Sequence, residues 1–173
     1  MRFRGECFRA HDPSWSWDPL SGAGAALKGR RFNWPGLETL YLSLGFTTVF
    51  REVSAGFAHR LTPYVLCSYD VDCEDITDLR TEAERARAGV TLDALGCAWG
   101  NALIAGRQPD SWAVVRQLLA KGRAGMLVPS FANGATKDDQ NLVLWRWGPD
   151  VPHKVTVHDP TGKLPRNRLS WEG

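Results

Sequence analysis

The sequence predicts an α+β fold, in which strands and helices follow one another without a regular repeat. The clearest helix lies at residues 110–121, where Val115, Leu118 and Leu119 form one apolar stripe. The clearest strand lies at residues 141–147, whose letters NLVLWRW are apolar at neighbouring positions, as in a central strand buried on both faces. The other segments lack the βαβ rhythm of a doubly wound fold, which favours α+β.

Each predicted strand is a short run of apolar, aromatic and β-branched residues bounded by turn residues. These runs lie at residues 2–9, 31–34, 39–44, 60–69, 125–128, 141–147 and 155–158. Pro63 favours an edge position for the run at 60–69, because proline donates no hydrogen bond to a neighbouring strand.

A second helix is predicted at residues 47–58, where apolar residues recur every four positions. Side-chain oxygens are expected to cap the first turn of both helices. The candidates are Thr47 or Thr48 for this helix and Asp110 or Ser111 for the other.

Two longer stretches, residues 11–30 and 71–88, are expected to contain loops. Residues 11–30 are rich in Pro, Gly, Ser and Trp, and a loop of this length in a compact domain is usually functional or mobile. Trp15 and Trp17 near its middle could present a docking surface for a protein, or simply pack within the loop. Residues 71–88 are acidic and then mixed in charge, which indicates a loop that leads into a helix.

Composition indicates one globular domain over residues 1–173. With 21 Lys and Arg against 19 Asp and Glu, the formal net charge is +2, too small for a typical nucleic-acid-binding surface. The four cysteines form no C-x-x-C pair, so we expect free, reduced thiols. We expect neither a signal peptide nor a membrane-spanning segment, and therefore a cytoplasmic protein.

The common nucleotide and metal motifs are incomplete. Gly22 and Gly24 fit two of the three dinucleotide-motif glycines, but Leu27 stands in the third place, and the GRR at 29–31 lacks the Lys and Ser/Thr of a P-loop. The run DVDCE at 70–74 lacks the later glycine and glutamate of a calcium loop, which favours a solvated acidic loop. The four histidines have no metal-binding spacing, so we expect no metal.

Four residues could together bind a dinucleotide without these motifs. Arg9 and Arg31 supply planar donors to a diphosphate, and Tyr41 supplies a ring that stacks on a base. Glu52 could bind ribose hydroxyls and stabilise positive charge that develops on a sugar ring. Each also has an ordinary interpretation, as a surface charge, a packed strand residue or an exposed helix residue.

The position of Glu52 suits a site at the edge of a buried face. It lies three residues after Val49, beside the apolar stripe of the predicted helix. Gly56 leaves room one turn later, and His59 lies on the same face.

At these residues the sequence resembles the RES-domain toxins of bacterial RES–Xre toxin–antitoxin systems, a family named for an Arg, a Glu and a Ser. The matching motifs follow the family's order along most of the chain. They are FR ending at Arg9, SGAGA at 21–25, GRRFNWPG at 29–36, LYLS at 40–43, Glu52 on a helix, and VPS ending at Ser130.

The resemblance implies a fold related to ADP-ribosyltransferases, with central β-sheets flanked by helices, and a site for NAD as substrate. It implies that Arg31 holds NAD with help from Arg9, and that Tyr41 stacks on nicotinamide. Glu52 would bind the nicotinamide ribose and stabilise an oxocarbenium-like state. Ser130 would hydrogen-bond the ligand or shape the pocket, although it could equally cap a turn after proline.

The implied activity is cleavage of the nicotinamide–ribose bond of NAD and transfer of ADP-ribose, with a protein favoured over water or phosphate as acceptor. The alternatives are an NAD glycohydrolase or phosphorylase, a family member that binds NAD without turnover, and a non-catalytic nucleotide- or nucleic-acid-binding module. The resemblance also implies an Xre-type antitoxin that blocks the active site, with nucleic acid reached only through that antitoxin and with no membrane partner.

Overall fold

A single seven-stranded sheet forms the centre of the fold. The computed structural model describes residues 1–54, 63–167 and 169, and within them the strand order is β4-β5-β6-β2-β1-β3-β7. Neighbouring strands are antiparallel, apart from the parallel pair β4 and β5. The strands are β1 (Phe3–His11), β2 (Leu40–Ser43), β3 (Val65–Cys73), β4 (Ile76–Asp78), β5 (Gly125–Pro129), β6 (Gln140–Leu144) and β7 (His153–Val157). The predicted α+β class is confirmed.

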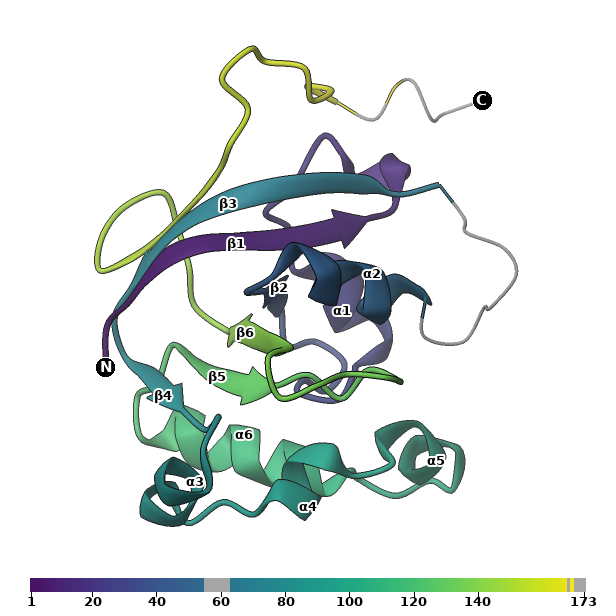
Figure 1. Cartoon of the computed structure of the whole chain (residues 1–173). Coiled ribbons are helices and arrows are strands. Elements are labelled where there is room, and N and C mark those ends of the chain that lie inside the picture. Colours follow the sequence, from purple (N-terminus) through teal and green to yellow (C-terminus); the bar gives the residue numbers. More distant parts are fainter. Residues whose placement is uncertain (55–62, 168, 170–173) are drawn as a thin grey trace.

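Helices cover the sheet unevenly. Figure 1 shows α3 to α6 gathered beside β4 and β5, while α2 lies against β1 and β2. The helices are η1 (Pro13–Trp15), α1 (Ala23–Lys28), α2 (Phe46–Ser54), α3 (Glu82–Ala88), α4 (Leu92–Gly96), α5 (Trp99–Ile104) and α6 (Asp110–Ala120). In the described parts of the chain, we find no helix with the length and apolar character needed to cross a bilayer.

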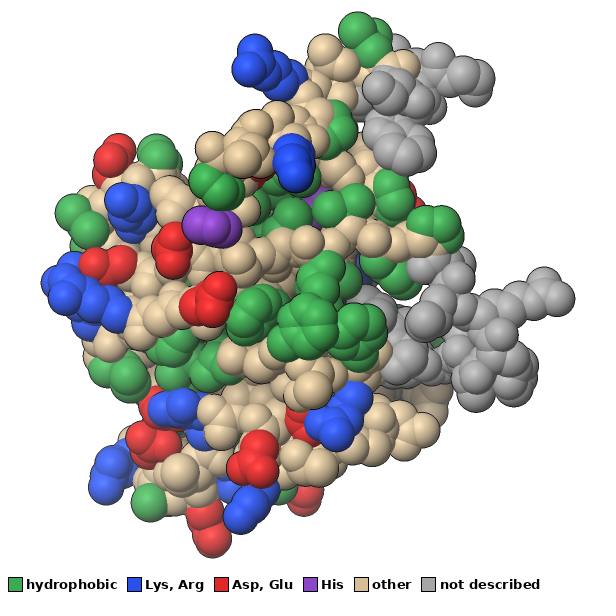
Figure 2. Space-filling model, turned by 45° about the horizontal axis from the view of Figure 1, so that its top comes forward, with side chains coloured by type: hydrophobic (Ala, Val, Ile, Leu, Met, Phe, Trp, Pro, Cys, Tyr) green, Lys and Arg blue, Asp and Glu red, His purple; other side chains and the backbone are tan. Residues whose placement is uncertain are grey.

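The face of the molecule in Figure 2 carries basic and acidic side chains interspersed around a band of hydrophobic ones. Charges of both signs alternate along this face without a broad basic patch. This distribution agrees with the small net charge of the sequence.

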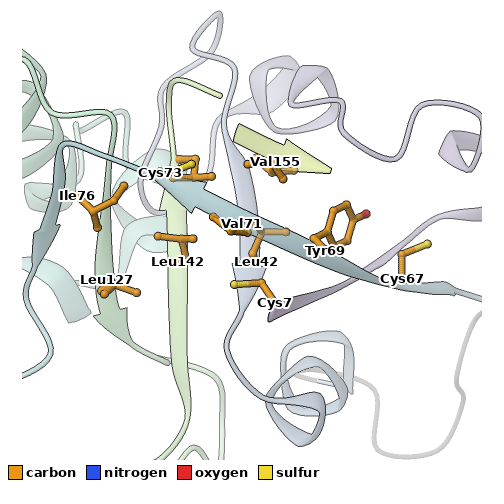
Figure 3. Close-up of a cluster of buried hydrophobic side chains, with 12 residues drawn as sticks. Cys7, Leu42, Cys67, Tyr69, Val71, Cys73, Ile76, Leu127, Leu142 and Val155 are labelled. Carbon is orange, nitrogen blue, oxygen red and sulfur yellow. The ribbon is translucent and has the colours of Figure 1, made fainter. Parts of the chain in front are cut away.

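Two apolar cores lie on opposite faces of the sheet. Figure 3 shows the first core, to which every strand of the sheet contributes. Its buried members are Cys7, Leu40, Leu42, Cys67, Tyr69, Val71, Cys73, Ile76, Leu127, Leu142, Leu144 and Val155. The three cysteines among them are free thiols, as expected, and so is the half-buried Cys97.

The second core lies between the sheet and helices α4 and α6. Its buried members are Phe32, Leu79, Val90, Leu95, Val114, Val115, Leu118, Met126, Val128, Val143 and Trp145. Strand β6 contributes to both cores, because Leu142 and Leu144 face one and Val143 faces the other. The prediction of a central strand buried on both faces is therefore confirmed, although the strand ends at Leu144 and not at Trp147.

The acidic stretch at 70–74 is not a solvated loop, as we expected, but mostly strand. Val71 and Cys73 are buried in β3, while Asp70 and Asp72 project from the other face of that strand. Asp72 accepts hydrogen bonds from Arg2 at 2.5 Å and from Arg4 at 3.0 Å. Alternation of acidic and apolar residues was the strand signal here, and the charges concealed it. Strand β3 also pairs on both sides, so the edge position expected for it is wrong.

The predicted strand at 31–34 is a turn instead. Its backbone makes one isolated bridge, between Arg30 and Asn33, and the Asn33 side chain donates to the carbonyls of Ala25, Trp34 and Leu37. A side chain that binds so many nearby carbonyls competes with strand pairing. The expected loop at 11–30 likewise contains η1 and α1.

Neither capping prediction holds for α6, whose first turn has no side-chain cap. Ser111 instead donates to the carbonyl of Arg31. On α2, Thr48 donates to Asp139 at 2.8 Å. Both side chains thus bind a distant segment, which sequence spacing could not reveal. The predicted extent of α2 beyond Ser54 lies outside the described residues.

His11 should make the stability of the fold depend on pH. It is buried, and neither ring nitrogen has a hydrogen-bond partner within the described residues. Burial, followed by the charge of Arg9, lowers the pKa of His11 from its ordinary 6.5 to about 4, against a smaller opposite effect of Asp12. The unfolded chain therefore takes up a proton on this residue that the folded chain refuses between these two pH values.

We expect stability to fall as pH drops from 6.5 to about 4, with His11 accounting for up to about 3 kcal/mol of the loss. His11→Leu should remove this part of the pH dependence. Urea unfolding of both proteins at a series of pH values measures it. Parallel curves of unfolding free energy against pH for the two proteins would contradict the prediction.

Candidate active site

Glu52 lies at the meeting point of three elements. Its Oε1 accepts a hydrogen bond from Ser130 Oγ at 2.6 Å and one from Asn141 Nδ2 at 2.7 Å. Both bonds end on the same carboxylate oxygen, and no described residue donates to Oε2. The Glu52 side chain is exposed, so the second oxygen can receive a ligand.

The sheet register brings the two donors to Glu52. Asn141 on β6 pairs with Ser43 on β2 and with Val128 on β5. Ser43 Oγ donates to Asn141 Oδ1 at 2.9 Å, which leaves the Asn141 amide nitrogen free to donate to Glu52. Ser130 follows β5 directly, and its Oγ also accepts from the Ala132 backbone at 3.2 Å. The Ser130 hydroxyl therefore caps this turn and contacts Glu52 at the same time.

Arg31 lies beside this cluster with its charge left without a carboxylate partner among the described residues. One guanidinium nitrogen donates to the carbonyls of Leu95 at 3.2 Å and Cys97 at 2.7 Å. The guanidinium carbon lies 4.9 Å from the centre of the Phe131 ring. Burial lowers the pKa of Arg31, and the nearby Cys97 and Glu52 act in the opposite direction. The influence of Glu52 indicates that the two charges lie within electrostatic reach.

The turn that carries Arg31 is fixed from both sides. Ser111 and Trp112, in the first turn of α6, donate to the carbonyls of Arg31 and Arg30 respectively. Tyr41 Oη accepts from the Phe32 backbone at 3.1 Å and donates to Asn33 Oδ1 at 2.8 Å. The hydroxyl of Tyr41 is thus committed to the turn, while burial raises the pKa of Tyr41 and keeps it a neutral donor.

Arg9 is the one predicted site residue that the structure sets apart. It lies on β1 between Cys7 and His11, so its side chain leaves the sheet on the face of the first core, whereas Tyr41 packs against the second. Its guanidinium donates to the carbonyls of Pro19 at 3.0 Å and Ser21 at 3.1 Å. Burial lowers the pKa of Arg9. In this position Arg9 anchors the segment that leads into α1.

The sequence indicated Glu52 and Ser130, which the structure brings into contact, but it did not single out Asn141, Ser43 or Asp139. Asn141 stood at the start of a predicted strand, where a polar residue is unremarkable without knowledge of the pairing. The S of the LYLS motif, Ser43, gave the one available signal. His59, which was expected on the same helix face as Glu52, lies outside the described residues.

Within the described residues, the cluster combines a carboxylate with one unbonded oxygen, a guanidinium with unbonded N–H donors, and an aromatic ring. A carboxylate so placed can accept from sugar hydroxyls and stabilise a nearby cation. A guanidinium with unoccupied donors binds phosphate well. No group of three or more potential metal ligands occurs in the part of the chain that the structure describes.

Comparison with known proteins identifies the family to which this chain belongs. The sequence matches the RES domain over residues 6–167, and the chain therefore belongs to the RES-domain family. Its fold is similar to that of the toxin in the crystal structure of the M. tuberculosis MbcT–MbcA toxin–antitoxin complex, with a TM-score of 0.63 and 25% sequence identity. The similarity covers 92% of this chain and 84% of the other. Comparison with curated protein sequences gives no match.

The anchoring contacts of Tyr41 can be tested apart from any activity. Tyr41→Phe keeps the ring but leaves the Phe32 backbone N–H unpaired, so we expect a loss of about 1–3 kcal/mol of unfolding free energy. Tyr64→Phe is the matched control, because Tyr64 is 43% exposed, and it should change stability by less than about 0.5 kcal/mol. Equal stability of the two variants in urea would show that the Tyr41 hydroxyl has no anchoring role.

Proposed function

We propose that this protein is an NAD-consuming toxin of a toxin–antitoxin pair, which cleaves the nicotinamide–ribose bond and transfers ADP-ribose. The observation that carries the proposal is the hydrogen bonding of the Glu52 carboxylate. One carboxylate oxygen is fixed by Ser130 and Asn141, and the other is open, while the charge of Arg31 lies within electrostatic reach of the carboxylate. Family membership and the similarity to the MbcT toxin support the same activity class.

The proposed chemistry needs little help for the leaving group. Nicotinamide leaves NAD as a neutral molecule from a cationic pyridinium, so no general acid is required. Positive charge then develops on the ribose, and the Glu52 carboxylate stabilises it electrostatically, as carboxylates do in glycoside hydrolysis. Ser130 and Asn141 keep the carboxylate in one orientation, which lowers the cost of organising it during the reaction.

Arg31 would bind the diphosphate or the adjoining ribose. Its guanidinium is oriented by two carbonyls and the Phe131 ring, yet it makes no ion pair within the described residues that would neutralise it. The ring of Tyr41 would stack on nicotinamide while its hydroxyl holds the Arg31 turn. Arg9 would assist indirectly, by holding the backbone at Pro19 and Ser21.

The acceptor of ADP-ribose is proposed to be a protein. Trp15 and Trp17 stack with ring centres 6.5 Å apart and are half-buried, so they offer aromatic surface for such an acceptor. Water and phosphate are the alternative acceptors, and each predicts a different product. A non-catalytic nucleic-acid-binding module is disfavoured by the small net charge of +2.

An enzyme that consumes NAD would harm its own cell, so we also propose an antitoxin partner of the Xre type. The similar M. tuberculosis protein was crystallised in a toxin–antitoxin complex, which supports a partner of this kind. Blocking the ligand-accessible oxygen of Glu52 would suffice to silence the proposed reaction.

Nicotinamide release from NAD tests the proposal. Glu52→Gln can still accept hydrogen bonds from Ser130 and Asn141 but carries no charge, so we expect turnover to fall by about 100-fold or more. Glu82→Gln, in the first turn of α3, removes the same charge elsewhere and should retain full activity. Chromatography of the reaction mixture gives the rates.

Unchanged nicotinamide release in Glu52→Gln would sink the catalytic assignment, and no release by the wild-type protein would sink the activity itself. Radiolabelled NAD distinguishes the acceptors. Label on protein supports ADP-ribosylation, whereas free ADP-ribose or its phosphate identifies a glycohydrolase or a phosphorylase.

A further inference from the structure

A buried carboxylate lies behind the candidate site, at the base of the loop between β5 and β6. Asp139 is 2% exposed. Its side chain accepts hydrogen bonds from the Thr136 backbone and hydroxyl, both at 2.8 Å, and from Thr48 Oγ1 at 2.8 Å. It also forms an ion pair with Arg51. Four donors to one carboxylate explain why Asp139 is tolerated inside the protein.

These partners belong to two different segments. Thr48 and Arg51 lie on α2, and Thr136 lies in the loop that joins β5 to β6. The hydrogen bond from the Thr136 backbone lowers the pKa of Asp139 the most, followed by those from Arg51 and Thr48, and together they outweigh the opposite effect of burial, so the carboxylate remains charged. A charged group in this position links the helix to the loop, since neither segment offers another buried anion here within the described residues.

The same two segments carry the groups that meet at Glu52. On α2, Thr48 lies one helical turn before Glu52 and Arg51 is its immediate neighbour. In the loop, the Ser130 backbone donates to the carbonyl of Asp139 at 2.8 Å, and Asn141 follows two residues later. The Asp139 side chain therefore holds α2, which carries the acceptor Glu52. The Asp139 backbone holds Ser130, and it lies two residues before Asn141, the other donor to Glu52.

We propose that Asp139 is the positioning residue of the candidate site, which sets Glu52 against Ser130 and Asn141. It touches no reacting group itself. The expected effect of Asp139 on turnover rests on the proposed function. Its expected effect on the Ser130–Glu52 contact is independent of that function. A small displacement of a catalytic carboxylate costs far more in turnover than in substrate binding when other residues bind the substrate.

Paired variants test this role. Thr48→Val removes one donor to Asp139 at nearly constant volume, whereas Thr48→Ser keeps the hydroxyl. Asp139→Asn removes the charge and places an amide among four donors, and Asp138→Asn makes the same change at the exposed neighbour. All four variants are assayed at a temperature well below their thermal unfolding midpoints, after circular dichroism has shown that they are folded.

We expect kcat for nicotinamide release to fall about 10-fold or more in Asp139→Asn and several-fold in Thr48→Val, with KM for NAD within about threefold of wild type. Thr48→Ser and Asp138→Asn should retain wild-type kcat. A change confined to KM, or equal kcat in Thr48→Val and Thr48→Ser, would overturn the positioning role.

Crystal structures of the wild type and Asp139→Asn provide a readout that does not depend on activity. The 2.6 Å contact between Ser130 Oγ and Glu52 Oε1 should be lost or lengthened in the variant. Should Asp139→Asn fail to fold, the Thr48→Val structure takes its place, with the same expectation. Persistence of the contact would refute the proposal, even if the wild-type protein proves inactive on NAD.

Discussion

The pairing of β6 with both β2 and β5 is the constraint on which the site depends. It sets Asn141 opposite Ser43 on one side and opposite Val128 on the other, so three strands contribute to one polar cluster. A slip of one residue would turn Asn141 to the opposite face and bury it in the first core. Leu142 and Leu144 oppose such a slip, because their own burial fixes the register. The burial of apolar residues on both faces of β6 thus specifies the geometry of the polar site.

Arg31 illustrates how the fold keeps a charge available. Its guanidinium is oriented by backbone carbonyls and an aromatic ring, groups that hold a cation without cancelling its charge. The turn beneath it is fixed by Tyr41, Ser111 and Trp112, whose polar atoms bind backbone groups of residues 30–33 or the Asn33 amide. The half-buried guanidinium of Arg31 is thus held in one orientation with its charge uncancelled by a described carboxylate.

Sequence patterns predicted those parts of the fold whose partners are local. The stripe of α6 and the run of apolar letters in β6 identified both elements, because periodicity reflects burial directly. The patterns failed where polar side chains either redirect the chain or conceal the apolar alternation of a strand. Asn33 turns the chain by binding carbonyls on both sides of it, and Asp70 and Asp72 masked a strand. Among the site residues, Glu52 and Ser130 were found by motif, whereas Asn141 and Asp139 became visible only once the register was known.

Glu52 and Arg31 lie within electrostatic reach, yet they form no salt bridge in the described structure. A direct ion pair would occupy the carboxylate oxygen and the guanidinium donors that a ligand needs. Separate anchors prevent this: Ser130 and Asn141 hold the carboxylate, and the carbonyls of Leu95 and Cys97 hold the guanidinium. Two opposite charges held apart in this way attract the two ends of a molecule that is itself anionic at one end and becomes cationic at the other. A dinucleotide losing a pyridinium leaving group has this character, since its diphosphate is anionic and its reacting ribose becomes cationic.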